Sequence, residues 1–155
     1  MKQTLLYTIA AILFLSCGSK EGGSDSDILA LPDINSGKLV YHHYTCYDCM
    51  DSELFLYDFA SKSLQNLSEK WDISHPMNAY FSDDGKQISF MGIAANGSWD
   101  IFLYTLGSAD QPENITNSSG VRDEDPKFSF DGKYIVFKQN GQLAIFDMET
   151  RKVQK

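Results

Sequence analysis

The sequence contains none of the short motifs that mark the common catalytic sites. It has no Gly-x-Ser-x-Gly nucleophile elbow, no glycine-rich phosphate loop and no His-Glu-x-x-His zinc motif. After residue 30 it also has no stretch with the apolar period of an amphipathic helix. These absences predict a protein without helices that is not an enzyme, with no catalytic residue, no cofactor and no metal site.

Basic residues are also scarce. The chain has 13 Lys and Arg against 21 Asp and Glu, which gives a formal net charge of −8. An acidic surface repels nucleic acid and anionic lipid headgroups, so we expect no nucleic-acid partner. Cations, sugars and basic protein patches remain compatible with this charge.

Long apolar runs are limited to one, at the start of the chain. Residues 5–15 follow the basic Lys2 and are mostly apolar, but the run is too short to span a bilayer stably. This pattern predicts a secretory signal peptide over residues 1–16. Its removal takes Lys2 away, so the net charge changes from −8 to −9.

The end of this run, Phe14-Leu15-Ser16-Cys17-Gly18, resembles a bacterial lipobox. The resemblance implies that Cys17 is lipidated with palmitate-type acyl chains and becomes the mature N-terminus. An ordinary cleaved signal peptide is the alternative. After Cys17, residues 18–27 are all Gly, Ser or charged, so residues 17–33 predict a flexible tether. Residues 34–155 are expected to fold.

Two of the three cysteines, Cys46 and Cys49, form a Cys-x-x-Cys pair shortly after His42 and His43. A covalent haem site would need His after the second cysteine, where Met50 stands, and a thioredoxin-like centre would need a helix N-terminus. Zinc could use both cysteines and one histidine, although the sequence has no second pair. In an exported protein we expect a disulfide between Cys46 and Cys49.

A twelve-residue segment occurs twice. Residues 79–90, AYFSDDGKQISF, recur almost residue for residue at 126–137, PKFSFDGKYIVF. Each copy predicts a strand, a turn closed by Asp-Gly and a second strand with apolar residues at alternate positions. Three such turns are marked by Gly37, Gly85 and Gly132, which are 48 and 47 residues apart. Periods of this length indicate propeller blades or solenoid turns.

Two further strand patterns recur within each period. One has a polar residue followed by at least four apolar residues, at 53–58, 100–105 and 142–147; the other is shorter, at 63–68 and 113–116. Four antiparallel strands per unit describe a propeller blade, whereas a β-solenoid would need shorter and more regular rungs. The sequence therefore predicts an all-β fold, an incomplete β-propeller of about three four-stranded antiparallel blades.

The repeated unit resembles that of TolB-type β-propellers. The family pattern runs Pro-x-(Trp/Phe)-Ser-Pro-Asp-Gly-Lys-x-Ile-x-Phe, then Asp-Ile-Tyr, then Leu-Thr; here it is matched by residues 125–137, 100–104 and 114–116. Phe130 and Asp83 stand where the family has Pro. The resemblance covers roughly Gly37 to the end and implies a role in the bacterial envelope, where TolB proteins bind envelope lipoproteins. Those proteins also carry a separate N-terminal domain that has no counterpart here.

The two ends of the repeat are incomplete. The first copy has no inner strand before Gly37, and the last copy stops inside its fourth strand, at residues 151–155. Open sheet edges and exposed blade faces invite self-association. Because only residues 28–32 could supply the missing strand, and Pro32 suits an edge alone, we expect a marginally stable monomer or a heterogeneous oligomer rather than a defined ring.

The connections between the second and third strands differ in every copy, and variable loops on a fixed scaffold are where binding specificity usually resides. These connections lie at the same end of the blades as the links between blades. The residues that we expect there are Tyr47, Trp71, His75, Trp99, Arg122, Asp123 and Glu124. They form a candidate surface for a protein or a sugar. Alternatively, the tryptophans fill gaps between blades and the acidic residues lie in solvated turns.

These observations favour a non-enzymatic envelope lipoprotein with TolB-like propeller repeats, anchored by lipid in the outer membrane and facing the periplasm or the cell surface. It would bind an envelope protein or a glycan through its loops. The alternative is a non-catalytic propeller fragment of a larger hydrolase or lyase, similar to prolyl peptidases or pectate-degrading lyases.

Overall fold

The computed structural model of the protein describes residues 34–154. The predicted signal peptide, the tether and Cys17 lie outside this range. The described residues form eleven strands and one short 3-10 helix, η1 (Tyr47–Cys49). Among them, no helix is long and apolar enough to cross a membrane.

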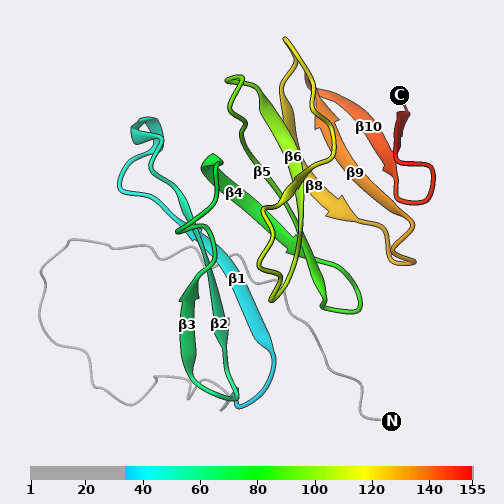
Figure 1. The fold of residues 1–155 in the computed structure, drawn as a ribbon. Coiled ribbons are helices and arrows are strands. Elements are labelled where there is room, and N and C mark those ends of the chain that lie inside the picture. The colour runs from blue at the N-terminus through cyan, green and yellow to red at the C-terminus, as the bar shows by residue number, and fades with distance from the viewer. Residues whose placement is uncertain (1–33, 155) are drawn as a thin grey trace, which may run out of the picture.

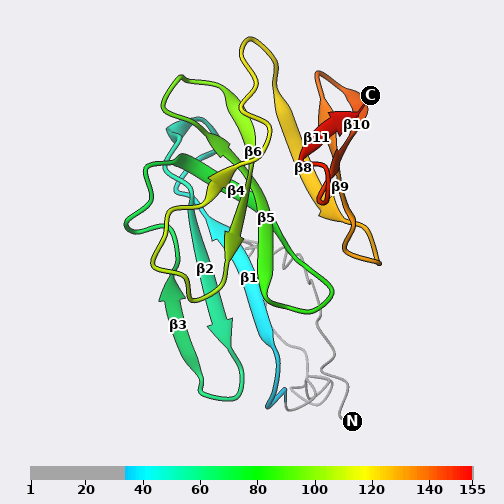
Figure 2. The same ribbon diagram turned by 45° about the vertical axis from the view of Figure 1, so that its right-hand side comes forward.

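The strands form three antiparallel sheets, which follow one another along the chain as three blades (Figures 1 and 2). The first blade is built from β1 (Lys38–His43), β2 (Glu53–Asp58) and β3 (Ser63–Asn66). The second consists of β4 (Ser74–Phe81), β5 (Gln87–Ile93), β6 (Trp99–Thr105) and β7 (Glu113–Asn114). The third consists of β8 (Asp123–Phe128), β9 (Tyr134–Gln139), β10 (Gln142–Asp147) and β11 (Lys152–Gln154).

This architecture confirms the predicted all-β, incomplete propeller with about three antiparallel blades. Each complete sheet is a meander in which consecutive strands pair, as propeller blades are. In the described residues the first sheet has three strands, and the strand that it lacks is the inner one, as the sequence indicated.

Aligning Gly37 with Gly85 and Gly132 places the strands of the first unit one residue away from their structural equivalents. The backbone N–H that closes the third strand donates to the carbonyl of Gly37 in the first blade, of Lys86 in the second and of Lys133 in the third. Gly37 is therefore equivalent to the residue after Gly85. Strand pairing agrees, because Tyr41 faces Phe55 as Phe90 faces Phe102.

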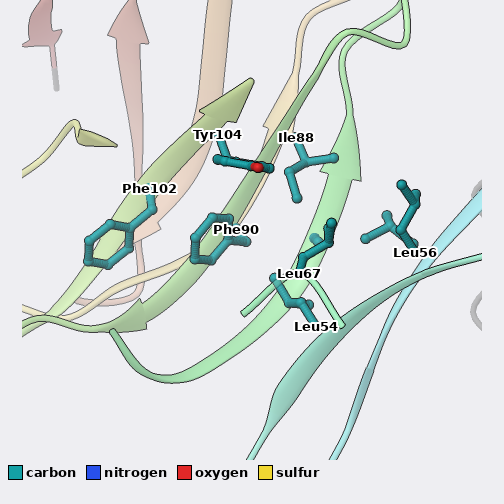
Figure 3. Packing of buried hydrophobic residues seen from close by; sticks show 9 residues of the cluster. Leu54, Leu56, Leu67, Ile88, Phe90, Phe102 and Tyr104 are labelled. Atoms are coloured by element: carbon teal, nitrogen blue, oxygen red, sulfur yellow. The ribbon is translucent and has the colours of Figure 1, made fainter. Parts of the chain in front are cut away.

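The core consists of two apolar clusters, one at each junction between neighbouring blades. At the first junction, Leu54 and Leu56 of the first blade belong to one cluster with Phe90, Phe102 and other residues of the second (Figure 3). The second junction brings together these buried residues of the second and third blades: Met77, Met91, Ile101, Leu103, Ile115, Ile135, Phe137, Ala144 and Phe146. Because side chains alternate along a strand, the two faces of the second blade serve different junctions.

The inner strands β4 and β8 are irregular at matching places. Their pairing with β5 and β9 shifts register around Asn78 and Asp125, and both residues have φ of +53°. The Asn78 amide donates to Asp125 Oδ1 over 2.7 Å. Equivalent bulge residues of neighbouring blades are thus joined directly.

Candidate functional site

One end of the blades carries the loops that the sequence singled out, and we call it the loop face. It comprises residues 44–52, 67–73, 94–98 and 115–121, together with the tight Asn140–Gly141 turn. The η1 helix, the β5–β6 loop and the β7–β8 link lie toward the top of Figure 1. The topology therefore brings segments from all three blades to one end.

Four of the predicted residues meet on the loop face, and we call them the Trp99 cluster: His75, Trp99, Arg122 and Glu124. The imidazole of His75 lies edge-on to the Trp99 ring, with 5.5 Å between centroids. The Arg122 guanidinium lies 4.4 Å from the centroid of the same ring, a cation–π contact. Arg122 Nε also donates to Glu124 Oε1 over 2.7 Å.

Backbone pairing holds this cluster in place. Trp99, the first residue of β6, forms an isolated parallel bridge with Arg122, which immediately precedes β8. Asn140 also holds Arg122 through two hydrogen bonds of 2.9 Å. The Arg122 backbone N–H donates to Asn140 Oδ1, and the Asn140 backbone N–H donates to the Arg122 carbonyl. The cluster thus spans the second and third blades.

Charged groups continue from the cluster along β8 and onto β9. Lys138 Nζ lies 3.5 Å from Glu124 Oε2 and 2.8 Å from Asp125 Oδ2. Burial alone would raise the pKa of Asp125, but the hydrogen bond and charge of Lys138, with Asn78, bring that pKa below its usual value. Lys138 was not predicted from the sequence, because its position beside Glu124 depends on the cross-strand pairing of β8 and β9.

His75 lies beside Ser52, yet the two do not form a nucleophile and its base. The backbone N–H of Ser52 donates to His75 Nδ1 over 3.0 Å, and the Ser52 hydroxyl donates to the Pro76 carbonyl over 2.6 Å. Both side chains are buried. A catalytic serine would instead present its hydroxyl to the imidazole.

The environment of His75 favours its neutral form. Burial lowers the pKa of His75 below its ordinary 6.5; the Asp51 carboxylate opposes this and the Arg122 guanidinium adds to it. The pKa of His42 is also lowered, first by burial and then by the charge of His75. His42 is half-buried and stacks on Tyr44, whereas His43 is exposed.

A shallow depression of about 540 Å³ adjoins the cluster between the first and second blades. Its lining includes His43, Thr45, Asp51, Ser52 and Glu53. The Thr45 hydroxyl and backbone N–H both donate to the Asp51 carboxylate, which closes the loop at its base. The hydrogen bond from the Thr45 hydroxyl is the main reason that the pKa of Asp51 is lowered.

Two predicted surface residues lie elsewhere. Trp71 stacks on Phe90 with 5.1 Å between ring centroids and also contacts Tyr104, so it packs against the first junction. Asp123 is fully buried, because alternation along β8 turns it inward while Arg122 and Glu124 point outward. Tyr47 lies in η1 on the loop face.

Asp123 belongs to a buried polar group at the second junction. Its Oδ1 accepts from Gln139 Nε2 over 3.0 Å, while Asp123 Oδ2 and Gln139 Oε1 have no hydrogen-bond partner. Asp100, also fully buried, accepts from the Ser118 N–H over 3.0 Å and from the Asn114 amide over 2.6 Å. Asp100 therefore anchors the link that leads to Arg122.

Cys46 and Cys49 are joined by a disulfide in the first loop. Cys46 precedes the single 3-10 turn of η1, and Met50 after it is in the left-handed conformation. Both cysteines are exposed, at the tip of a loop whose base is closed by Thr45 and Asp51. Among the described residues, no group of three or more His, Cys, Asp or Glu side chains is placed to hold a metal ion.

Comparison with solved structures matches the blade arrangement. TolB from Acinetobacter baumannii superimposes with a TM-score of 0.56 and 23% identity, over 71% of this chain and 27% of that one. A protein assigned as TolB from Agrobacterium tumefaciens gives a TM-score of 0.59 at 20% identity, over 76% and 44%. The fold is that of a TolB-like β-propeller.

The TolB-like propeller fold also occurs in a protease. The β-propeller domain of the Trilobed protease from Pyrococcus furiosus matches with a TM-score of 0.55 and 15% identity, over 75% of this chain and 37% of that domain. This chain spans less than half the length of each of these three structures. No family model and no curated protein matches the sequence.

Proposed function

We propose that the protein is a non-enzymatic component of the bacterial envelope that binds another protein through its loop face. The Trp99 cluster is the observation that carries this proposal. It gathers aromatic and charged side chains from separate segments at one end of a rigid scaffold, which is the usual construction of a recognition surface.

The geometry of Trp99 favours a protein partner over a glycan. A sugar stacks on a bare aromatic face, but the guanidinium of Arg122 lies over the Trp99 ring, which also packs against the second junction. The groups left for a partner are charged: the exposed Arg122 on one side, and the exposed Asp51 and Glu53 in the depression. A partner with both basic and acidic side chains would pair with them.

Site-specific crosslinking tests this proposal. A photoreactive residue at position 122 should crosslink one discrete envelope protein, whereas the same residue at position 133, on the opposite end of the blades, should not. With that protein purified, Arg122→Glu should weaken binding by about tenfold or more. Lys133→Glu makes the same charge change and should leave binding unaltered.

The two tryptophans allow the glycan alternative to be tested as well. In a Trp71→Phe variant the tryptophan emission comes from Trp99 alone. Peptidoglycan fragments and acidic oligosaccharides should leave that emission unchanged. A saturable change with a neutral or acidic glycan would replace the protein partner by a sugar.

The anchor that we propose for this location is the lipidated Cys17. Single acyl chains bind membranes only marginally, and the several chains of a mature lipoprotein would give stable attachment. Cys17→Ser should therefore release the protein from membranes in detergent-free fractionation. A mutant that stays with the membranes would exclude lipidation as the anchor.

A second candidate function is that of a propeller module in a protease. It is supported by the likeness to the propeller domain of the Trilobed protease. If the protein in the cell envelope is much longer than 155 residues and hydrolyses peptides, this second function replaces the first.

A further inference from the structure

The two junctions inside the chain are built to one plan. Each blade has a leading face, which contacts the blade before it, and a trailing face, which contacts the blade after it. At the first junction the trailing residues Leu54 and Leu56 are packed in one cluster with the leading residues Phe90 and Phe102. At the second, the trailing residues Ile101 and Leu103 are packed in one cluster with Phe137 and other leading residues of the third blade.

The leading face of the first blade has the same composition as the buried leading faces. Cross-strand pairing puts Tyr41 with Phe55 and Leu39 with Tyr57, where the second blade has Phe90 with Phe102 and Ile88 with Tyr104. The rings of Tyr41 and Phe55 stack with 5.5 Å between centroids, and Tyr41 is 36% exposed. This face is therefore apolar and pre-formed, but belongs to neither core cluster.

The trailing face of the third blade is its counterpart. Val136 pairs with Ile145, and Lys138 with Leu143, at positions where the second blade has the buried residues Leu103 and Ile101. Leu143 is 68% exposed, although its equivalents Ile101 and Leu54 are fully buried.

We propose that these two end faces bind each other between two copies of the chain. The leading face of one copy would cover the trailing face of the other, as happens twice within each copy, and the interface is head-to-tail. Two copies supply six blades, twice the three described sheets. Closed propellers have roughly four to eight, so two copies can complete a ring where three could not.

The incomplete inner edge of the first blade does not prevent this contact. The sequence predicted no defined ring, because the first unit lacks an inner strand. The end-face residues come from β1 and β2 in the first blade and from β9 and β10 in the third, and all four strands are formed. Lys138, on the trailing face, is already paired with Asp125 and Glu124, so its charge is compensated.

Two substitutions test the two faces separately. Tyr41→Glu puts a charge on the leading face, and Leu143→Glu puts one on the trailing face. The full chain is studied by sedimentation in a mild detergent that keeps its apolar N-terminal residues in solution. The unaltered protein should form a dimer, and each variant alone should dimerise at least about tenfold more weakly.

Mixing the variants distinguishes a head-to-tail interface from a symmetric one. The Leu143→Glu chain keeps its leading face and the Tyr41→Glu chain keeps its trailing face, so an equal mixture should regain a dimer. This recovery also shows that both variants are folded. Phe130, which is 90% exposed in the turn between β8 and β9, provides the control, and Phe130→Glu should dimerise like the unaltered protein.

Three results would overturn the proposal. The unaltered chain could stay monomeric at concentrations above about 100 μM. Its dimerisation affinity would then be far too low for stable assembly. Leu143→Glu could dimerise as well as Phe130→Glu, which would place the contact elsewhere. Open filaments in place of dimers would show that the head-to-tail contact does not close.

Discussion

His75 combines a buried imidazole with a left-handed backbone, since its side chain is 4% exposed and its φ is +53°. Residues other than glycine rarely adopt this conformation, although Asn, Asp and His tolerate it better than most. The hydrogen bond from the Ser52 N–H to Nδ1 requires that nitrogen to be unprotonated. The neutral ring therefore links the first two blades at the loop face.

This linkage predicts a pH-dependent stability. Because the folded pKa of His75 lies below 6.5, the unfolded chain binds protons first as the pH falls. Stability should be complete above pH 6.5 and decline as the pH approaches the folded pKa. His75→Asn keeps an acceptor and suits the backbone, so its urea midpoint should change less between pH 7 and pH 5. His42→Gln is the comparison, since the pKa of His42 is also lowered; an unchanged pH profile in His75→Asn would contradict this role.

Ser89 is a second residue with a local consequence. It is fully buried in β5, and its hydroxyl has no hydrogen-bond partner. The equivalent positions of the other blades carry Val40 and Val136. Ser89→Val should raise the free energy of unfolding by about 1 kcal/mol, because an unpaired buried hydroxyl is costly. Thermal and urea unfolding measure this, and a destabilised Ser89→Val together with a stabilised Ser89→Ala would show that space, not polarity, sets the residue.

The bulges of β4 and β8 govern how neighbouring inner strands meet. Asn78 has a left-handed backbone and also donates to the Asp125 carboxylate. Asn78→Gly removes the hydrogen bond but relaxes the backbone, and should cost about 1–2 kcal/mol. Asn78→Ala removes the bond and strains the backbone, and should cost roughly 1 kcal/mol more. Equal losses in chemical denaturation would mean that the backbone conformation carries no stability here.

At the level of elements, local signals predicted most of the fold. The Asp-Gly turns and the alternating apolar residues, such as Ile88 and Phe90, correctly predicted where strands form along the sequence. The register of the first unit could not be read this way. Gly37 and Gly85 both have positive φ, at 100° and 67°, yet they occupy turns that differ by one residue. A shared glycine therefore marks a turn without fixing the pairing that follows.

The candidate site was predictable only in part, for related reasons. Counting strands places Trp99 and Arg122 at the same end, because antiparallel strands return their loops to one edge. The sequence could not predict where the Trp71 side chain points, because Trp71 lies in a link without apolar periodicity. Its orientation is set by packing against Phe90. Asp123 was wrongly expected on the surface, because the residue at which β8 begins decides which of its side chains face inward. A shift of one residue in that start exchanges the inward and outward positions, and Asp123 is in fact buried.

At the scale of the whole molecule, the three blades are coupled only to their neighbours. The strands of the first blade contact β4, and the strands of the second contact β8. Repeat proteins of this kind behave as linear arrays, in which stability sums intrinsic terms and nearest-neighbour interfaces. Breaking one junction therefore frees an end blade and leaves the other junction intact.

The middle blade is the only described one with an apolar cluster on both faces. We therefore expect the blades to differ in how often they open as well as in how they are packed. Its amide hydrogens should exchange with solvent most slowly, because β5 and β6 open only when both junctions are lost. The strands of the end blades should exchange through partial openings that leave the rest of the array folded. Hydrogen–deuterium exchange on a dilute sample measures this order. Uniform protection across β2, β5 and β9 would instead make the protein a single cooperative unit, so that damage to any one blade would unfold all three.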